Sequence, residues 1–209
     1  MTSKLFSLKI KTLHCNQATG GGGSDEPYIL LMPFSESGTI NQCYLSEAQQ
    51  KFTNGSIWNI DKEMILELDD NLNDINILIS LYEKDNGQLY ASLKEQLENS
   101  TWPLVLSEKK EWAKAWSEIK LKAPSLIKNT AASLSATKLS FELSKVLLGA
   151  LKLITKQSLK DDDLGSVLLN LNREAFKLAE IETRKIEFTG KDSHYELVLE
   201  MVRMENLIE

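Results

Sequence analysis

Two stretches of alternating apolar and polar residues, one near each end of the chain, constrain the fold more than any other feature. Their apolar positions are Phe6, Leu8, Ile10, Tyr195, Leu197, Leu199 and Met201. A period of two residues predicts a β-strand with one buried face and one face in water. Strands at both ends of a chain indicate a β domain that is completed only by its last segment.

Further strands are predicted between these two. Short apolar or alternating runs occupy residues 28–32, 64–68, 75–81, 165–171 and 186–188. Turn sequences such as Asn54-Gly55 and Asn86-Gly87 separate several of them, and Pro33 closes the first. Strands at this spacing are typical of an antiparallel β-sandwich. Residues 173–184 suit a helix as well as a strand and stay open at this point.

The pattern changes between the two groups of strands. Trp112, Trp116 and Ile119 fall at i, i+4 and i+7 of a helix that we expect to start near Ser107. After Pro124, a second helix is predicted over residues 125–157, which are rich in Ala, Leu and Ser. The sequence therefore predicts a mainly β fold, α+β overall. Residues 1–90 begin the sandwich, 91–157 form a helical insertion, and 158–209 supply the final strands.

Charge and composition exclude some classes of protein. Hydrophobic content of 42% and charged content of 26% are those of a globular protein. The 30 acidic and 24 basic residues give a net charge of -6, which argues against broad nucleic-acid binding. The start has no apolar signal region, and no window approaches the ~18 apolar residues of a spanning helix. We expect a soluble protein made in the cytoplasm, and any export would have to be leaderless.

No catalytic signature is present. The sequence lacks a Gly-x-Ser-x-Gly elbow, a His-Glu-x-x-His pair and a Cys-x-x-Cys pair. His14 and His194 have no ligand or base partner at a suitable spacing, and Cys15 follows His14 directly, so the two side chains point to opposite faces of a strand. Cys15 and Cys43 suit two buried thiols better than one bridge. We expect the chain not to be an enzyme.

Four consecutive glycines interrupt the first part of the chain. Residues 20–24 read Gly-Gly-Gly-Gly-Ser, which fits a flexible surface loop and is also the composition of an engineered linker. No helix start and no Lys-Ser or Lys-Thr pair follows the run. A phosphate-binding loop is therefore not predicted here.

Three segments share a pattern of acidic residues beside strands. They read GSDEPYILL at 23–31, ILISLYEKD at 77–85 and DDDLGSVLL at 161–169. Together they resemble the C-two domain family of calcium-dependent lipid-binding β-sandwiches, over residues 4–90 and 158–203. The chain departs from the family pattern at Glu26, which is inserted, and at Glu83, where Asp is usual. Residues 86–160 also separate two segments that lie close together in the family.

The resemblance implies an ion site. Its ligands would be Asp25 in the first loop, Glu83 and Asp85 as the central pair, and Asp162 in the late loop. Calcium takes six to eight oxygen ligands, which several converging carboxylates supply. The family's further acidic residue has no counterpart in residues 16–19. The alternative is that the four are ordinary solvated loop residues.

Tryptophans and lysines lie together in the insertion. Trp112 and Trp116 are one helical turn apart and have Lys109, Lys110 and Lys114 around them. Tryptophans flanked by lysines are typical of a helix that lies on an anionic membrane, although both rings would equally suit packing onto the sandwich. Residues 126–151 would suit a packed helix or a segment that inserts into a membrane, where their charged residues would make insertion costly.

These observations leave three hypotheses for function. The first is a non-enzymatic module that associates peripherally with membranes, with or without calcium, and whose toxin-like variant perturbs them. The second is a protein–protein interaction module, such as an inhibitor or adaptor, that uses the helical insertion. The third is an enzyme without a recognisable motif. Partners are therefore an anionic membrane surface or a protein, with no nucleic acid and no cofactor other than calcium.

Overall fold

A computed structural model describes most of the predicted β region. The described residues are 4–19, 24–35, 43–68, 74–85, 88–98, 117, 135–138, 162–172, 181–190 and 192–204. Their strands are β1 (Lys4–Gln17), β2 (Pro27–Ser35), β3 (Tyr44–Leu45), β4 (Ile57–Leu68), β5 (Asp74–Glu83), β6 (Ser135–Lys138), β7 (Asp162–Asn172), β8 (Ile181–Thr189) and β9 (His194–Met204). One helix, α1 (Gln88–Glu98), follows β5.

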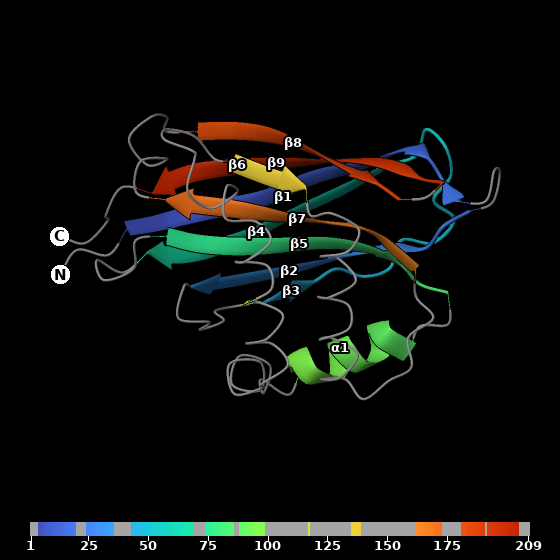
Figure 1. Ribbon diagram of the computed structural model, residues 1–209, viewed down its shortest axis with the longest axis horizontal. Helices are drawn as coiled ribbons and strands as arrows, with labels where there is room; N and C mark the ends of the chain where they lie inside the picture. Colours follow the sequence, from blue (N-terminus) through green and yellow to red (C-terminus); the bar gives the residue numbers. More distant parts are fainter. Residues whose placement is uncertain are drawn as a thin grey trace.

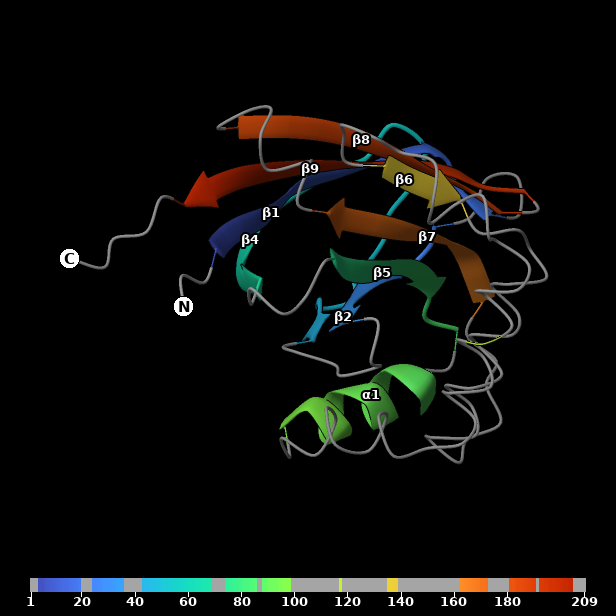
Figure 2. The same ribbon diagram turned by 60° about the vertical axis from the view of Figure 1, so that its left-hand side comes forward.

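The strands form two antiparallel sheets. Sheet A has the order β4-β1-β9-β8 and sheet B the order β3-β2-β5-β7-β6. The two sheets face each other, and α1 lies on the side of sheet B that points away from sheet A (Figures 1 and 2). The predicted mainly β sandwich is confirmed. The first and last long strands, β1 and β9, are neighbours in sheet A, as expected for a domain completed by its last segment.

The facing sides of the two sheets bury one hydrophobic core. The alternating residues of β1 and β9 point into it, including Leu8, Ile10, Leu197 and Leu199, each at most 1% exposed. Sheet B contributes alternate residues such as Ile29 and others of β5 and β7. Burial of such side chains is worth about 1.5–3 kcal/mol each, so the alternation that marks the strands in the sequence also drives the two sheets together.

Pro33 does not end its strand. Ile29 exchanges hydrogen bonds with Ser46 beyond β3, since its N–H donates to Ser46 Oγ at 2.8 Å and its carbonyl accepts from Ser46 N–H at 2.9 Å. Backbone groups two residues apart in a strand point the same way, so the nitrogen of Pro33 also points toward the β3 side. The described pairing with β3 covers only Leu30 and Leu31, so proline removes no donor that this ladder uses.

The insertion differs from its prediction in two described places. A helix already begins at Gln88, before the predicted boundary at 91, because Leu89, Tyr90 and Leu93 form an apolar stripe at helical spacing and are buried. Ser135–Lys138 forms β6, where a helix was predicted, and pairs with β7 from Asn170 to Val167. Pairing with an open strand edge overrides the local helix preference. The other residues of 99–161, apart from 117, lie outside the description.

The open question at 173–184 is settled for its last four residues. Positions 181–184 belong to β8, which pairs along its whole length with β9. Alternate β8 residues such as Ile186 and Phe188 point into the core, 3% and 1% exposed. The two-residue period specifies a strand, because a helical period of 3.6 would not place these residues on one face.

Candidate functional site

The four predicted carboxylates come from segments that meet at one end of sheet B. Glu83, at the end of β5, pairs in register with Pro27 at the start of β2 and with Asp162 at the start of β7. Asp25 lies two residues before β2, and Asp85 follows β5. This end of the sandwich, the acidic loop end, lies opposite both chain termini (Figure 1). The antiparallel order of β2, β5 and β7 thus gathers residues distant in sequence.

Asp25 is buried and held by protein donors. Only 1% of the residue is exposed. Its carboxylate accepts hydrogen bonds from the backbone N–H of Thr19 at 2.9 Å, from the Thr19 hydroxyl at 2.6 Å, and from the Tyr195 hydroxyl. Its own backbone exchanges two 2.9 Å hydrogen bonds with Phe52. Because Thr19 and Asp25 flank the glycine run, their bonds close the loop at its base whatever its composition.

Tyr195 links this carboxylate to the opposite sheet. The side chain lies on β9 in sheet A and is fully buried, with its ring stacked on Phe52 at a centroid distance of 6.3 Å. Burial, together with the hydrogen bond to Asp25, raises the pKa of Tyr195, so the phenol stays protonated and remains a donor. A buried phenol needs such a partner, and Asp25 supplies it. The Tyr195–Asp25 bond therefore ties sheet A to the loop that precedes β2.

The cysteine and histidine near this end have no catalytic arrangement. Cys15 is 1% exposed, and burial raises the pKa of its thiol, which keeps it protonated. The adjacent His14 is half-buried, and its Nε2 lies 3.1 Å from the Thr12 hydroxyl. Residues next to each other on β1 point to opposite faces, as predicted. No disulfide joins Cys15 and Cys43.

The remaining carboxylates differ in their surroundings. Glu83 is half-buried, and its Oε2 lies 3.1 Å from the Thr19 hydroxyl, so Asp25 and Glu83 approach the same group. Asp85 is exposed, and the side chain of Asp162 is outside the description. The neighbouring Asp163 accepts a hydrogen bond from the Gly165 N–H at 3.0 Å, and burial raises the pKa of Asp163. The sequence did not distinguish these two aspartates.

Protein donors already occupy most of the Asp25 carboxylate. A carboxylate offers roughly four acceptor positions, and protein donors use three of those on Asp25. Within the described ranges, no group of three or more His, Cys, Asp or Glu side chains is placed to hold a metal ion. Asp25 acts as a structural clamp here. The calcium site itself stays a prediction, because the side chain of Asp162 is one of its four expected ligands.

The second predicted site falls outside the description. Trp112 and Trp116, with the flanking Lys109, Lys110 and Lys114, all belong to residues that the structure does not describe. Their role stays a prediction from sequence. Among the described helical residues, no helix has the length and apolar character needed to cross a bilayer.

Thr19 and Tyr195, which donate hydrogen bonds to Asp25, were not predicted from the sequence. Tyr195 was assigned to the core by its alternation, which is correct, but its hydroxyl also requires a partner. Thr19 stands beside the glycine run without any motif around it. Only the pairing of β1 with β9 brings the two close to Asp25, and that pairing spans almost the full chain.

Comparison with known proteins yields likenesses in structure. Neither protein-family models nor curated protein sequences match the chain. Among solved structures, human GIVD cytosolic phospholipase A2 matches with 11% identity and a TM-score of 0.45, covering 99% of this chain and 18% of that one. A C-two domain of plant extended synaptotagmin 1 matches with 9% identity and a TM-score of 0.45, covering 96% and 93%.

A third solved structure is of CC2D1B, whose printed description is that it coordinates ESCRT-III activity during the mitotic reformation of the nuclear envelope. It matches with 6% identity and a TM-score of 0.46 and covers 97% of this chain and 55% of that one. The two antiparallel sheets agree with the sandwich predicted from the sequence. At TM-scores below 0.5 the three likenesses carry no argument about what this chain binds.

Proposed function

We propose that this chain is a non-enzymatic binding module that associates peripherally with an anionic membrane surface. The observation that carries the proposal is the sequence spacing of Trp112 and Trp116, four residues apart and flanked by Lys109, Lys110 and Lys114. Tryptophan favours the bilayer interface, and each lysine near an anionic surface contributes about 1 kcal/mol. The proposed contact is therefore electrostatic attraction combined with anchoring by two aromatic rings.

Membrane association that depends on calcium is less well supported than association without calcium. The acidic loop end gathers the backbones of Asp25, Glu83 and Asp162, which supports a site there. Asp25, however, already accepts three hydrogen bonds from Thr19 and Tyr195. An ion would have to displace buried donors whose desolvation costs about 1–3 kcal/mol each. We therefore expect membrane binding that does not depend on calcium.

Flotation of the full chain with phosphatidylserine-containing liposomes tests the proposal. We expect equal binding with calcium and with a chelator. Replacing Lys109, Lys110 and Lys114 together by Gln should lower the partition coefficient on the order of 100-fold, because three contributions of about 1 kcal/mol are lost. The matched control replaces the exposed Lys51, Lys62 and Lys185 by Gln, which removes the same charge from other surfaces.

Each outcome of this experiment has a clear meaning. Binding that disappears with chelator, and with Asp85→Asn, would replace our proposal by a calcium-dependent one. Equal losses in the two triple variants would show attraction by net charge alone. Release of a trapped dye from the liposomes would identify the membrane-perturbing variant of the function. No flotation in any condition would contradict membrane association.

A protein–protein interaction module is the second candidate function, and a specific observation favours it. The outer face of sheet A carries exposed apolar side chains, including Ile65 and Ile181 at 44% and 60% exposure. Exposed apolar residues that form one patch mark interaction surfaces more often than residues scattered singly. This face is distinct from the helical insertion, which the sequence had suggested as the contact surface.

A further inference from the structure

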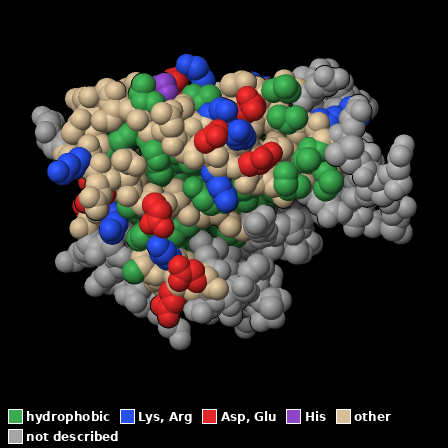
Figure 3. Space-filling view, turned by 180° about the vertical axis from the view of Figure 1, so that it is seen from behind, with side chains coloured by type: hydrophobic (Ala, Val, Ile, Leu, Met, Phe, Trp, Pro, Cys, Tyr) green, Lys and Arg blue, Asp and Glu red, His purple; other side chains and the backbone are tan. Residues whose placement is uncertain are grey.

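An apolar band crosses the outer face of sheet A near the chain termini. The register joins Ile65 of β4 to Ser7 of β1, Ser7 to Val202 of β9, and Val202 to Ile181 of β8. Leu5 and Met204 pair in the next row. We define the apolar band as Leu5, Ile65, Ile181, Val202 and Met204. Apolar side chains gather at this end of the face, at the right in Figure 3.

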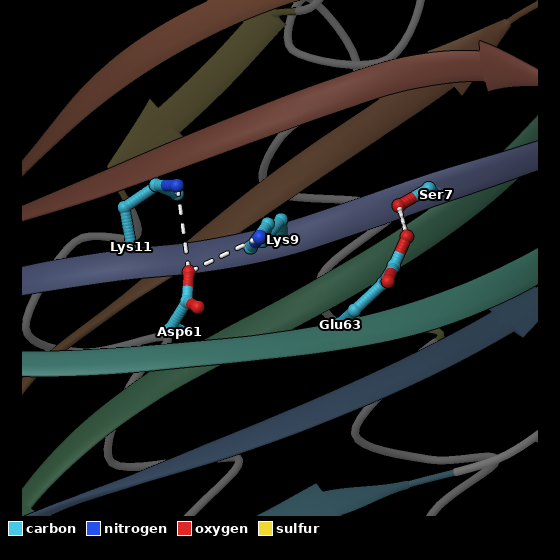
Figure 4. Close-up of polar contacts among 5 residues, drawn as sticks. All are labelled: Ser7, Lys9, Lys11, Asp61 and Glu63. Atoms are coloured by element: carbon cyan, nitrogen blue, oxygen red, sulfur yellow. Dashed lines mark hydrogen bonds and ion pairs between the residues drawn. The ribbon is translucent and has the colours of Figure 1, made fainter.

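The polar row beside the band has opposite charges on the two central strands. Lys9 of β1 pairs in register with Glu200 of β9 on one side and with Glu63 of β4 on the other. Asp61 holds Lys9 and Lys11 at 3.1 and 3.4 Å, and Ser7 donates to Glu63 (Figure 4). Two charged side chains next to the band, Lys9 and Glu63, therefore have neighbours that bind them.

Part of this pattern is symmetric about the seam between β1 and β9, although Ser7 and Val202 differ. Isoleucines occupy the two outer strands at one level, and Lys9 and Glu200 occupy the two inner strands at the next. Consider a two-fold axis that lies in the contact plane and runs parallel to this seam. It places Ile65 over Ile181 of a second copy, Leu5 over Met204, and Lys9 over Glu200. Each of these contacts occurs twice.

From this match we propose that the outer face of sheet A is the contact surface of a homodimer with that two-fold axis. The contact is isologous, as expected of a symmetric dimer, because one patch meets itself. Four strands spaced about 4.8 Å apart and eight residues of about 3.3 Å each give a face of roughly 400–500 Å² in plan. Two such faces bury less than the standard total area of specific interfaces, so we expect a weak dimer.

The strand edges of the sandwich are protected against a competing mode of pairing. At the free edge of sheet A, β8 carries an ion pair of Glu182 and Arg184 on its inward side. At the other edge, Asp61 of β4 has a φ of 48°, beside a shift in the register between β4 and β1. Inward charges and irregular edges oppose strand addition. Within the described part of sheet A, the outer face is therefore better suited to a second copy than the strand edges are.

Sedimentation velocity of the full chain, from micromolar to near-millimolar concentration, tests the dimer. We expect a concentration-dependent monomer–dimer equilibrium. Ile65→Asp and Ile181→Asp should each weaken dimerisation at least about 10-fold, because each variant buries one carboxylate from each copy in the contact. The matched control is Ile57→Asp. Ile57 lies on β4, as Ile65 does, but at the other end of the face, and is 58% exposed. This control should leave the equilibrium unchanged.

A charge exchange tests the symmetry itself. Lys9→Glu alone opposes two acidic side chains across the axis, and Glu200→Lys alone opposes two basic ones, so each variant should be monomeric. In an equimolar mixture, both contacts again join opposite charges, so the mixed dimer should recover. Circular dichroism of each variant verifies the fold, and the mixing result remains informative even if the isoleucine variants are unstable.

Several results would overturn the proposal. A chain that is monomeric at every concentration excludes the dimer. Equal weakening by Ile57→Asp and Ile65→Asp, or a mixture that dimerises no better than its components, places the contact elsewhere. If the chain is monomeric and Ile65→Asp abolishes flotation with liposomes, the apolar band belongs to the membrane contact instead.

Discussion

The two sheets of this sandwich differ in what lies on their outer sides. In sheet B, β2 and β5 are buried on both faces, and Tyr28, Leu30, Met32 and Leu78 on the outer face are at most 1% exposed. In sheet A, the inner face is buried, whereas the outer face holds charged rows and the apolar band, of which Ile65 and Ile181 are exposed. The same antiparallel architecture therefore provides a scaffold in one layer and an accessible surface in the other.

The contacts on the outer side of sheet B show how it is covered at one end. The ring of Tyr28 lies 5.5 Å from Tyr82 and 5.1 Å from Tyr90 of α1. The Tyr90 hydroxyl donates to Glu47 at 2.7 Å, and Lys94 donates to the same carboxylate at 3.0 Å. Further along, Ser80 and Ser166 bond at 2.8 Å in a buried pair. The polar groups named here on the outer side of sheet B thus have hydrogen-bond partners, which stabilises this sheet.

The largest expected effect comes from a cavity in the covered sheet. Leu78→Ala should lower the free energy of unfolding by about 2–5 kcal/mol, because Leu78 is 1% exposed and its removal leaves a cavity. Ile181→Ala, on the outer face of sheet A, should change it by less than about 0.5 kcal/mol. Urea unfolding measures both. Equal effects would contradict the contrast between the sheets.

The next effect tests the link between sheet A and the loop before β2. Tyr195→Phe removes a donor from the buried carboxylate of Asp25 and should cost about 1–3 kcal/mol in unfolding free energy. Tyr90→Phe makes the same chemical change where the acceptor, Glu47, is exposed, and water can replace the phenol. The second variant should therefore lose less. Thermal unfolding that ranks them in the opposite order would show that the clamp contributes little.

A half-buried carboxyl in sheet B gives a pH-dependent effect. Burial raises the pKa of Asp163 above its ordinary value of 3.8. Between the unfolded-state pKa and the raised folded-state pKa, the folded state therefore binds more protons than the unfolded state. Stability from this group is present below pH 3.8 and is lost as the pH rises through the folded-state pKa. Asp163→Asn keeps an acceptor for the Gly165 N–H and should be more stable than the native chain at pH 7.

That advantage of Asp163→Asn should shrink as the pH approaches 4. Urea midpoints at several pH values measure it, with Asp192→Asn at an exposed position as the control. A difference that is constant with pH would assign the effect to packing rather than to ionisation.

The smallest effect is expected on the outer face of sheet A. Asp61 is exposed and its partners Lys9 and Lys11 are half-buried, so water and salt screen their attraction. Asp61→Asn should leave the urea midpoint within experimental error, and the amide residue tolerates the positive φ at this position. A clear loss of stability would indicate that this face is less accessible to solvent than its exposure implies.

The sequence predicted the strands of the sandwich but not the arrangement of the polar groups around Asp25. Strands such as β1 and β9 follow from the two-residue period, which is a local property of the chain. The clamp depends on Thr19, six positions from Asp25, and on Tyr195, which reaches Asp25 from β9 across 170 positions of sequence. β6 was missed for the same reason, since its partner strand decides its conformation.

Limited oxidation of the free chain by peroxide, followed by peptide mapping, tests the contrast between the sheets most directly. Methionine oxidises according to its exposure. Met204 is half-buried on the outer face of sheet A, whereas Met32 is fully buried on the outer face of sheet B. We predict that Met204 is oxidised well before Met32, and that Met32 is protected as fully as Met64 of the core. Oxidation of Met32 as fast as Met204 would contradict the account, because sheet B would then have an open outer face.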